Sequence, residues 1–196
     1  MFNSITWPLG LATVLAILLI IAWLQRENLA ALISEWRVQH QLNQIGIEQI
    51  RNLNCFDGID GDYSISRLAL TDNSIVLISR RRYRGNIYCA KQISEWTQVI
   101  GQKSYKFENP LFEMENQLTA LRLLIGKIEL NAFLYFDSSA TFPKGRLESI
   151  LQPDNIPEHI LGQNCNSANP AVLAAWEQLK QFKADQSNAD TLELKT

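Results

Sequence analysis

Hydrophobic residues along the chain form three kinds of pattern: one unbroken apolar stretch, stretches with helical spacing, and short strand-like runs. No side chain between Met1 and Gln25 carries a charge, and residues 7–24 form one apolar run. At about 1.5 Å per residue a helix over this run would span about 27 Å, close to the hydrocarbon thickness of a bilayer. Trp7 and Trp23 stand near its two ends, where aromatic residues mark the membrane interface. The pattern predicts a transmembrane helix over residues 5–25.

The residues around this stretch favour a retained anchor over a cleaved signal peptide. No Lys or Arg precedes the apolar run, and no small-x-small cleavage site follows it. A buried core helix would rarely stay uncharged for so long. Arg26 and Arg37 follow the run, so the positive-inside rule predicts an outside N-terminus and a cytoplasmic domain. Membrane lipid is then one expected partner of this single-pass chain.

The rest of the chain alternates between helical and strand-like patterns. Apolar residues with spacings of three and four predict amphipathic helices, and short apolar runs bounded by turn residues predict strands. Helices are predicted over residues 26–45, 108–128 and 169–182, and strands over 47–55, 64–70, 75–79, 85–90 and 128–136. This order predicts an α/β fold in which a central mixed sheet is flanked by helices. We expect an anchor at 5–25, a domain at 26–165, a C-terminal helix at 166–183 and a flexible tail at 184–196.

Composition narrows the classes of protein and of site. The chain has 196 residues and a net charge of −2, so no global basic field attracts nucleic acid. The cysteines Cys55, Cys89 and Cys165 are widely spaced, which disfavours a zinc site and a disulfide framework. We expect reduced thiols and no structural metal; the alternative is a single Cys55–Cys89 disulfide in an oxidising compartment.

Several strings occur in an order that is typical of one family. The first helix contains "SEWRVQHQL" with Glu35, and a strand–turn–strand reads "ISRLALTDNSIVLISRRRYRG" over residues 65–85. Trp96 and the helix start "NPLFEMENQL" at 109–118 follow. Over roughly residues 32–140 this ordered set resembles the nuclease-related domain (NERD) family of the restriction-endonuclease-like PD-(D/E)xK superfamily. The resemblance implies a restriction-endonuclease-like fold and a metal-dependent nuclease ancestry.

The resemblance also shows where this chain departs from the family. The strand aspartate of the family falls at Ser66, the glutamate of its ExK motif at Ser79, and the lysine at Arg81. The glutamine that usually follows "NP" falls at Glu113, and Glu35 alone keeps the family's chemistry. These five residues make up the candidate catalytic site in its degenerate form.

This replacement changes what the site could do. Mg²⁺ prefers anionic oxygen ligands, and serine hydroxyls are neutral. Arginine cannot act as a general base, although its planar fork binds phosphate oxygens well. We therefore expect no cofactor, and Mg²⁺ or Mn²⁺ only if carboxylates such as Glu35 and Glu113 form a rebuilt site. Arg81, Arg82 and Arg84 are the candidate phosphate-binding residues; the alternative is that Arg82, Arg84 and their neighbour Arg80 face solvent or lipid head groups.

Together these features predict a membrane-anchored, nuclease-related protein without catalytic activity, which binds DNA, RNA or a protein partner. One alternative is an active metal-dependent DNA nuclease with a rebuilt site. A second alternative is a structural scaffold for interactions. The sequence leaves the oligomeric state open.

Overall fold

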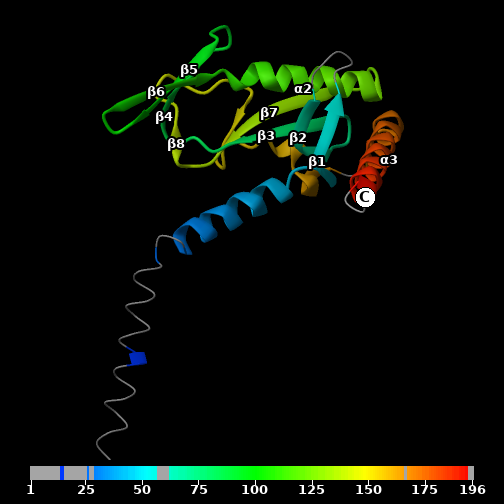
Figure 1. Ribbon diagram of the computed structural model, residues 1–196, viewed down its shortest axis with the longest axis horizontal. Coiled ribbons are helices and arrows are strands. Elements are labelled where there is room, and N and C mark those ends of the chain that lie inside the picture. The colour runs from blue at the N-terminus through cyan, green and yellow to red at the C-terminus, as the bar shows by residue number, and fades with distance from the viewer. Residues whose placement is uncertain (1–13, 16–25, 27–28, 57–61, 166, 194–196) are drawn as a thin grey trace, which may run out of the picture. The chain divides into compact units, whose positions relative to one another are not determined.

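The architecture was analysed in a computed structural model, which describes residues 14–15, 26, 29–56, 62–165 and 167–193. The described chain is a mixed α/β structure with two sheets (Figure 1). It divides into two compact units, one ending at Leu42 and one running from Asn43 onward. The first unit contributes most of a helix over residues 29–43, and the second contains the sheets and the remaining helices.

The larger sheet is mixed and has the strand order β1-β2-β3-β7-β9. Neighbours β1, β2 and β3 pair antiparallel, while β3, β7 and β9 pair in parallel. The strands span Glu48–Phe56 (β1), Asp62–Leu70 (β2), Ile75–Arg81 (β3), Leu130–Phe136 (β7) and Ile150–Leu151 (β9). In β3 the run Ile75–Ser79 is buried at every position, as expected for a central strand.

The smaller sheet has the order β6-β5-β4-β8 and extends from the carboxyl end of β3. Its strands span Gly85–Tyr88 (β4), Glu95–Ile100 (β5), Lys103–Glu108 (β6) and Ala140–Thr141 (β8). The β5–β6 hairpin was not predicted from the sequence. Five of the six β6 residues are exposed, so its hydrophobic pattern does not reveal a strand.

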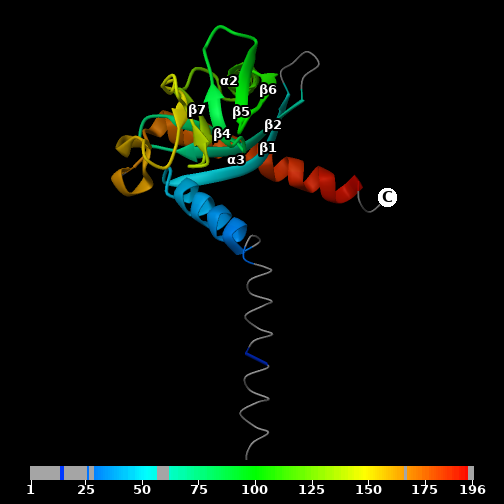
Figure 2. The ribbon, with the colours of Figure 1, turned by 90° about the vertical axis from the view of Figure 1, so that its left-hand side faces the viewer.

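Two long helices share one hydrophobic core with the larger sheet. Helix α2 spans Pro110–Ile125 and helix α3 spans Pro170–Glu193; short 3-10 turns lie at Glu158–Ile160 and Gly162–Asn164. Figure 2 shows α3 projecting from the sheet toward the C-terminus. Core residues from the strands and both helices pack together, including Leu53, Leu68, Leu77, Leu121, Leu134, Trp176 and Leu179.

Helix α3 extends through residues that the sequence assigned to a flexible tail from residue 184. Polar contacts with β1 accompany its later turns. Lys183 Nζ donates to the carbonyl of Asn52, and Gln186 Nε2 donates to the carbonyl of Asn54. These contacts between side chains and the backbone of β1 stabilise helical structure that the polar sequence of this segment does not suggest.

The predicted fold class is wrong in its transmembrane helix. Within the part of the chain that the structure describes, no helix has both the length and the apolar composition needed to cross a bilayer. The first continuous helical run begins at residue 29. Most of residues 5–25, with Trp7 and Trp23, lies outside the described residues. The membrane location and topology stay predictions.

Candidate functional site

The candidate site lies where the pairing between β2 and β3 ends. Paired residues run from Leu70↔Ile75 to Leu68↔Leu77 and go no further along the two strands. Beyond this point the Ser66 hydroxyl donates a 3.1 Å hydrogen bond to the carbonyl of Ile78. A side chain on β2 therefore takes the place of a ladder bond. We call this break in the pairing of β2 and β3 the gap.

Strand β1 is irregular at the same level. Asn52 has a φ of 53°, and the pairing with β2 passes from Arg51↔Arg67 directly to Leu53↔Ile65. Ser66 therefore lies opposite the unpaired Asn52, so the backbone at Ser66 is released from regular pairing on both sides.

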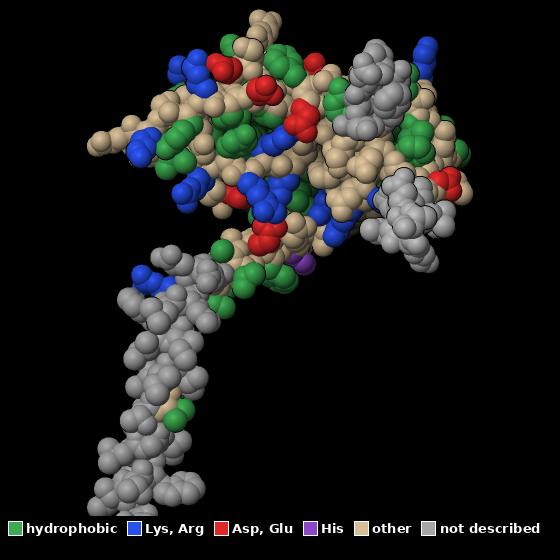
Figure 3. Space-filling model, in the orientation of Figure 1, with side chains coloured by type: hydrophobic (Ala, Val, Ile, Leu, Met, Phe, Trp, Pro, Cys, Tyr) green, Lys and Arg blue, Asp and Glu red, His purple; other side chains and the backbone are tan. Residues whose placement is uncertain are grey.

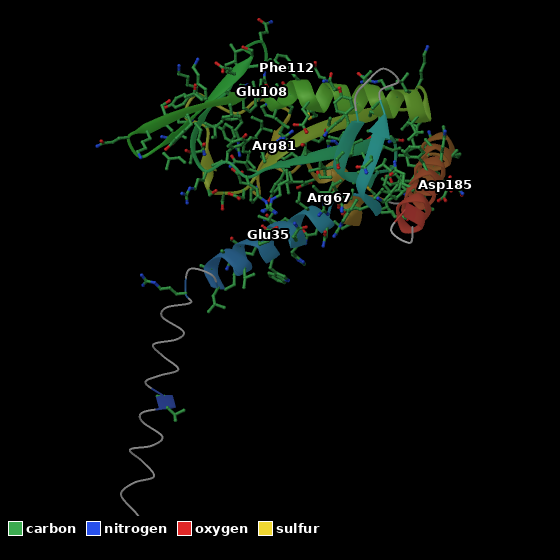
Figure 4. The ribbon with its side chains drawn as sticks, in the orientation of Figure 1. Glu35, Arg67, Arg81, Glu108, Phe112 and Asp185 are labelled. Carbon is green, nitrogen blue, oxygen red and sulfur yellow. The ribbon has the colours of Figure 1, made fainter. Side chains whose placement is uncertain are left out.

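Ser79 and Arg81 come from the end of β3, on the other side of this gap. Ser79 is buried. Arg81 Nη2 lies 2.7 Å from Glu113 Oε2 and forms an ion pair with it. Glu113 belongs to the first turn of α2, where a negative charge is favoured by the helix dipole. Figure 4 shows Arg81 on the strand side of the start of α2, which Phe112 marks.

The ion pair is continued by a buried glutamine. Gln117 Nε2 donates to Glu113 Oε1 at 3.2 Å and to the carbonyl of Ser64 at 3.1 Å. Arg81, Glu113, Gln117 and Ser64 thus connect β3, α2 and β2 across the gap. Gln117 Oε1 and Arg81 Nε are also buried, and neither has a hydrogen-bond partner within the described residues. Because an unpaired buried polar atom is costly, these two atoms mark hydrogen-bonding capacity that the packing around the ion pair leaves unused.

The donor set of this cluster does not suit a divalent cation. Ser66 and Ser79 offer neutral hydroxyls, and the carboxylate of Glu113 is bound by Arg81. Within the described residues, His, Cys, Asp and Glu side chains form no group of three or more that could hold a metal ion. Because Glu113 is about half exposed, the ion pair contributes less than about 1 kcal/mol to stability. The main effect of the ion pair is to hold the guanidinium of Arg81 beside the carboxylate of Glu113.

The structure therefore brings together four of the five predicted catalytic positions. Ser66, Ser79, Arg81 and Glu113 all lie in the second unit, around one gap. Glu35 lies on the helix over residues 29–43, in the first unit, where its Oε1 accepts a hydrogen bond from Gln39 Nε2 at 3.1 Å.

The candidate phosphate-binding arginines occupy the connection between β3 and β4. Arg82 and Arg84 are exposed, and Tyr83 between them points inward, stacked on Phe107 with ring centroids 4.0 Å apart. Gly85 ends this connection with a φ of 79°, and a Cβ there would lie 2.5 Å from the carbonyl oxygen of Val99. We call Arg82–Gly85 the arginine turn. In the string "RYRG" the two arginines are therefore exposed, and the tyrosine between them packs inward.

Asn109 of the "NP" string holds the start of α2 in place. Its Oδ1 accepts from the amide of Leu111 at 3.0 Å, which caps the helix. Its Nδ2 donates to the carbonyls of Ile93 at 2.8 Å and Lys91 at 3.2 Å. Asn109 therefore fixes α2, and with it Glu113, against the loop before β5. The sequence located the helix start, but gave no sign of these bonds to residues so far back in the chain.

The sequence analysis did not identify a buried arginine on β2. Arg67 is buried, and its Nη1 donates to Asn43 Oδ1 and Gln49 Oε1. Burial first, and then the charges of Arg51 and Arg80, lower the pKa of Arg67 to about 10. An arginine within the apolar run "RLAL" was the available signal. Arg67 places a buried positive charge on β2, the strand that also carries Ser66.

One of three comparisons with known proteins gives a match. No curated protein and no solved structure matches the chain. The family model of the nuclease-related domain matches residues 30–143, and this range includes Glu35, Ser66, Ser79, Arg81 and Glu113. The match covers more than half of the 196 residues and confirms the resemblance seen in the sequence. The chain belongs to the nuclease-related domain (NERD) family.

Proposed function

We propose that this protein is a nuclease-related domain that binds the phosphates of nucleic acid without cleaving them. The observation that carries the proposal is the ion pair between Arg81 and Glu113 in a gap whose other two key positions are Ser66 and Ser79. A cationic side chain occupies the place where a divalent cation would need anionic ligands.

The loss of cleavage follows from charge and proton chemistry. A metal ion in such a site positions a water molecule and stabilises the charge that develops on the phosphate. With two hydroxyls and a neutralised carboxylate, the site lacks the negative charge that would hold the ion. Arg81 keeps its proton at neutral pH, so it cannot take one from water. Its own charge is balanced by Glu113, so phosphate binding depends on the neighbouring exposed arginines.

Phosphate binding is supported by the arginine turn. Arg82 and Arg84 are exposed beside the gap, and guanidinium groups bind two phosphate oxygens at once. Figure 3 shows Lys and Arg side chains, interspersed with acidic ones, over the part of the molecule that carries β4, β5 and β6. Because the net charge of the chain is −2, binding depends on such a local patch.

The test is a binding and cleavage assay with the full-length chain, kept in mild detergent because residues 1–25 are apolar. Labelled single-stranded and duplex DNA are titrated at low salt, with and without Mn²⁺. We expect binding without cleavage, and weaker binding by the Arg82→Ala/Arg84→Ala double variant. Arg122→Ala, at the far end of α2, is the control for loss of a positive charge and should bind like the wild type. Mn²⁺-dependent cleavage that is lost in Glu113→Gln would refute the proposal and indicate a rebuilt metal site.

A further inference from the structure

A pocket opens beside the arginine turn, in the segment that follows β7. It has a volume of about 450 Å³. Its walls come from β8 and the loops on either side, with Ser138, Ala140, Thr141, Phe142, Gly145, Arg146, Gln152, Pro153 and Asp154 as lining residues. Strands β3 and β7 are parallel, and Arg81 pairs with Phe136 at their carboxyl ends. The pocket and the arginine turn both follow these ends, where ligands of α/β sheets usually bind.

Hydrogen bonds join the pocket wall directly to the arginine turn. The amide of Gly85 donates to the carbonyl of Ser139 at 2.8 Å, and Gly85 pairs with Ala140 in the parallel β4–β8 ladder. Thr141 Oγ1 donates to Asn86 Oδ1 at 2.6 Å. Arg84 is therefore one residue away from β4, the strand that pairs with the pocket-wall strand β8. A chain of phosphates held at the arginine turn would pass the mouth of this pocket.

The lining combines flat surfaces with fixed polar groups. Phe142 packs edge-on against Phe136, with ring centroids 5.2 Å apart. The guanidinium of Arg146 donates to Gln152 Oε1 at 3.0 Å and to Asp154 Oδ1 at 2.7 Å, which fixes its plane. Aromatic rings and guanidinium planes are the side chains on which unpaired bases stack. Ser138 and Thr141 add hydroxyls that can bond to a base edge.

The pocket wall is also held in a single arrangement. Gln152 is buried, and its Nε2 donates to the carbonyls of Asp137 at 3.1 Å and Ala140 at 2.8 Å. Its Oε1 is already bonded to Arg146. A ligand would therefore enter a preformed cavity, which lowers the entropic cost of binding.

A second pocket at the opposite end of the sheet does not fit the same ligand. It has a volume of about 520 Å³ and is lined by Thr71, Asp72, Asn73, Ser74, Glu129, Asn131, His159, Asn164 and Asn169. These lining residues include two carboxylates but no Lys, Arg, Phe, Tyr or Trp. The two carboxylates of such a surface repel a phosphate chain, and the imidazole of His159 is its one aromatic ring. Because Phe142 and Arg146 line the pocket beside the arginine turn, that pocket is the better candidate for binding a base.

We propose that the pocket lined by Ser138–Asp154 accepts an unpaired base of a single-stranded nucleic acid whose phosphates bind Arg82 and Arg84. The inference rests on the proposed function and adds to it a preference for single strands. In a duplex the bases are stacked and paired, so a base would have to leave the helix before it could enter.

The test compares three fluorescent DNA probes with the full-length chain by anisotropy at one salt concentration. The probes are a single strand, the same strand with abasic sites, and the duplex. We expect the intact strand to bind about tenfold more tightly than the abasic strand, the size of effect that base stacking gives. Thr141→Trp, an exposed pocket residue, should fill the cavity and remove this difference. Ser138→Trp, at a second exposed lining residue, is the alternative should one variant fold poorly.

The control is Thr119→Trp, an exposed position on α2 away from the pocket, which should keep the difference. Equal binding of intact and abasic strands by the wild type would overturn the base pocket and leave phosphate binding standing. An unchanged difference in both pocket variants would also overturn it. Absence of binding to every probe would instead refute the proposed function, and the base pocket with it.

Discussion

Ser66 and Ser79 are the residues at which this chain departs most from the chemistry of its family. Each hydroxyl can be replaced by the carboxylate that the family pattern places there. Ser66 now donates to the carbonyl of Ile78, and an aspartate at this position would repel that oxygen. Ser79 is buried, so a glutamate there would carry an unpaired charge. The present residues therefore suit a site without a metal ion.

A Ser66→Asp/Ser79→Glu double variant tests this account. Without metal we expect a lower melting temperature than the wild type, because two like charges are placed in the gap. Millimolar Mn²⁺ should recover part of the loss, since an ion that binds only the folded state stabilises it. The measurement is thermal unfolding with and without Mn²⁺. Each single variant serves as a control with one carboxylate, and a double variant that ignores Mn²⁺ would contradict the assigned positions.

Cys55 provides a prediction on pH dependence. It is buried, and burial raises the pKa of its thiol from 9.0 to about 11. The folded state therefore favours the protonated thiol, while the unfolded chain ionises near pH 9. Stability should be unaffected below about pH 9 and should fall as the pH rises from there toward 11.

Two measurements check this behaviour. Alkylation of Cys55 at pH 9 should be slow in the folded protein and fast in denaturant, as judged by peptide mass spectrometry. Denaturant unfolding between pH 8 and 11 should lose less stability in Cys55→Ala than in the wild type. Tyr135, whose pKa burial raises to about 12, also titrates at the upper end and remains in both proteins. Rapid alkylation of Cys55 in the folded state would contradict the burial.

At the scale of elements, the sequence predicts the central strands and the two long helices well because their burial follows a pattern. The continuous run "IVLIS" became β3, and the helices with three- and four-residue spacing became α2 and α3. Hairpin β5–β6 was missed because an exposed edge strand carries little apolar periodicity. The length of α3 was missed because it depends on contacts with β1.

Asn109 allows the start of α2 to be tested as an element. Asn109→Ala removes the helix cap and leaves the carbonyls of Ile93 and Lys91 without this donor. We expect a loss of about 2–3 kcal/mol in the free energy of unfolding. Asn109→Asp keeps the acceptor for Leu111 but places a carboxylate against those carbonyls, so it should be destabilised as well.

Urea unfolding of the two variants and the wild type measures these effects. If the cap alone mattered, Asn109→Asp would be as stable as the wild type. That result would show that the bonds to Ile93 and Lys91 contribute nothing to holding α2. Helix α3 has a cap of its own, in which the amide of Ala171 donates to Asn169 Oδ1. The Asn109 variants therefore leave the start of α3 unchanged.

At the scale of the whole molecule, the spacing of the family's motif residues in the sequence identified the candidate site. The contacts within that site depend on how distant elements pack together. The distance between Ser66 and Ser79 in the sequence follows from a strand, a turn and a strand, so it could be read from the pattern. The ion pair of Arg81 with Glu113 joins residues 32 positions apart and requires α2 to lie against the sheet. No local pattern contains that information. The pocket of residues 138–154 likewise depends on β8 pairing with β4.

The charge of the whole molecule leads to the last prediction, on salt dependence. A chain with a net charge of −2 repels nucleic acid at long range, so binding must come from a small number of direct phosphate contacts. If Arg82 and Arg84 each neutralise one phosphate of a single strand, the slope of log K against log salt should be about −1.4. The Arg82→Ala/Arg84→Ala variant should lose most of this slope, whereas Arg122→Ala should retain it. Anisotropy titrations over a range of NaCl concentrations give the slopes. A steep slope that survives in the double variant would mean that other basic side chains, such as those of β6, carry the contact, and the arginine turn would then lose its assigned role.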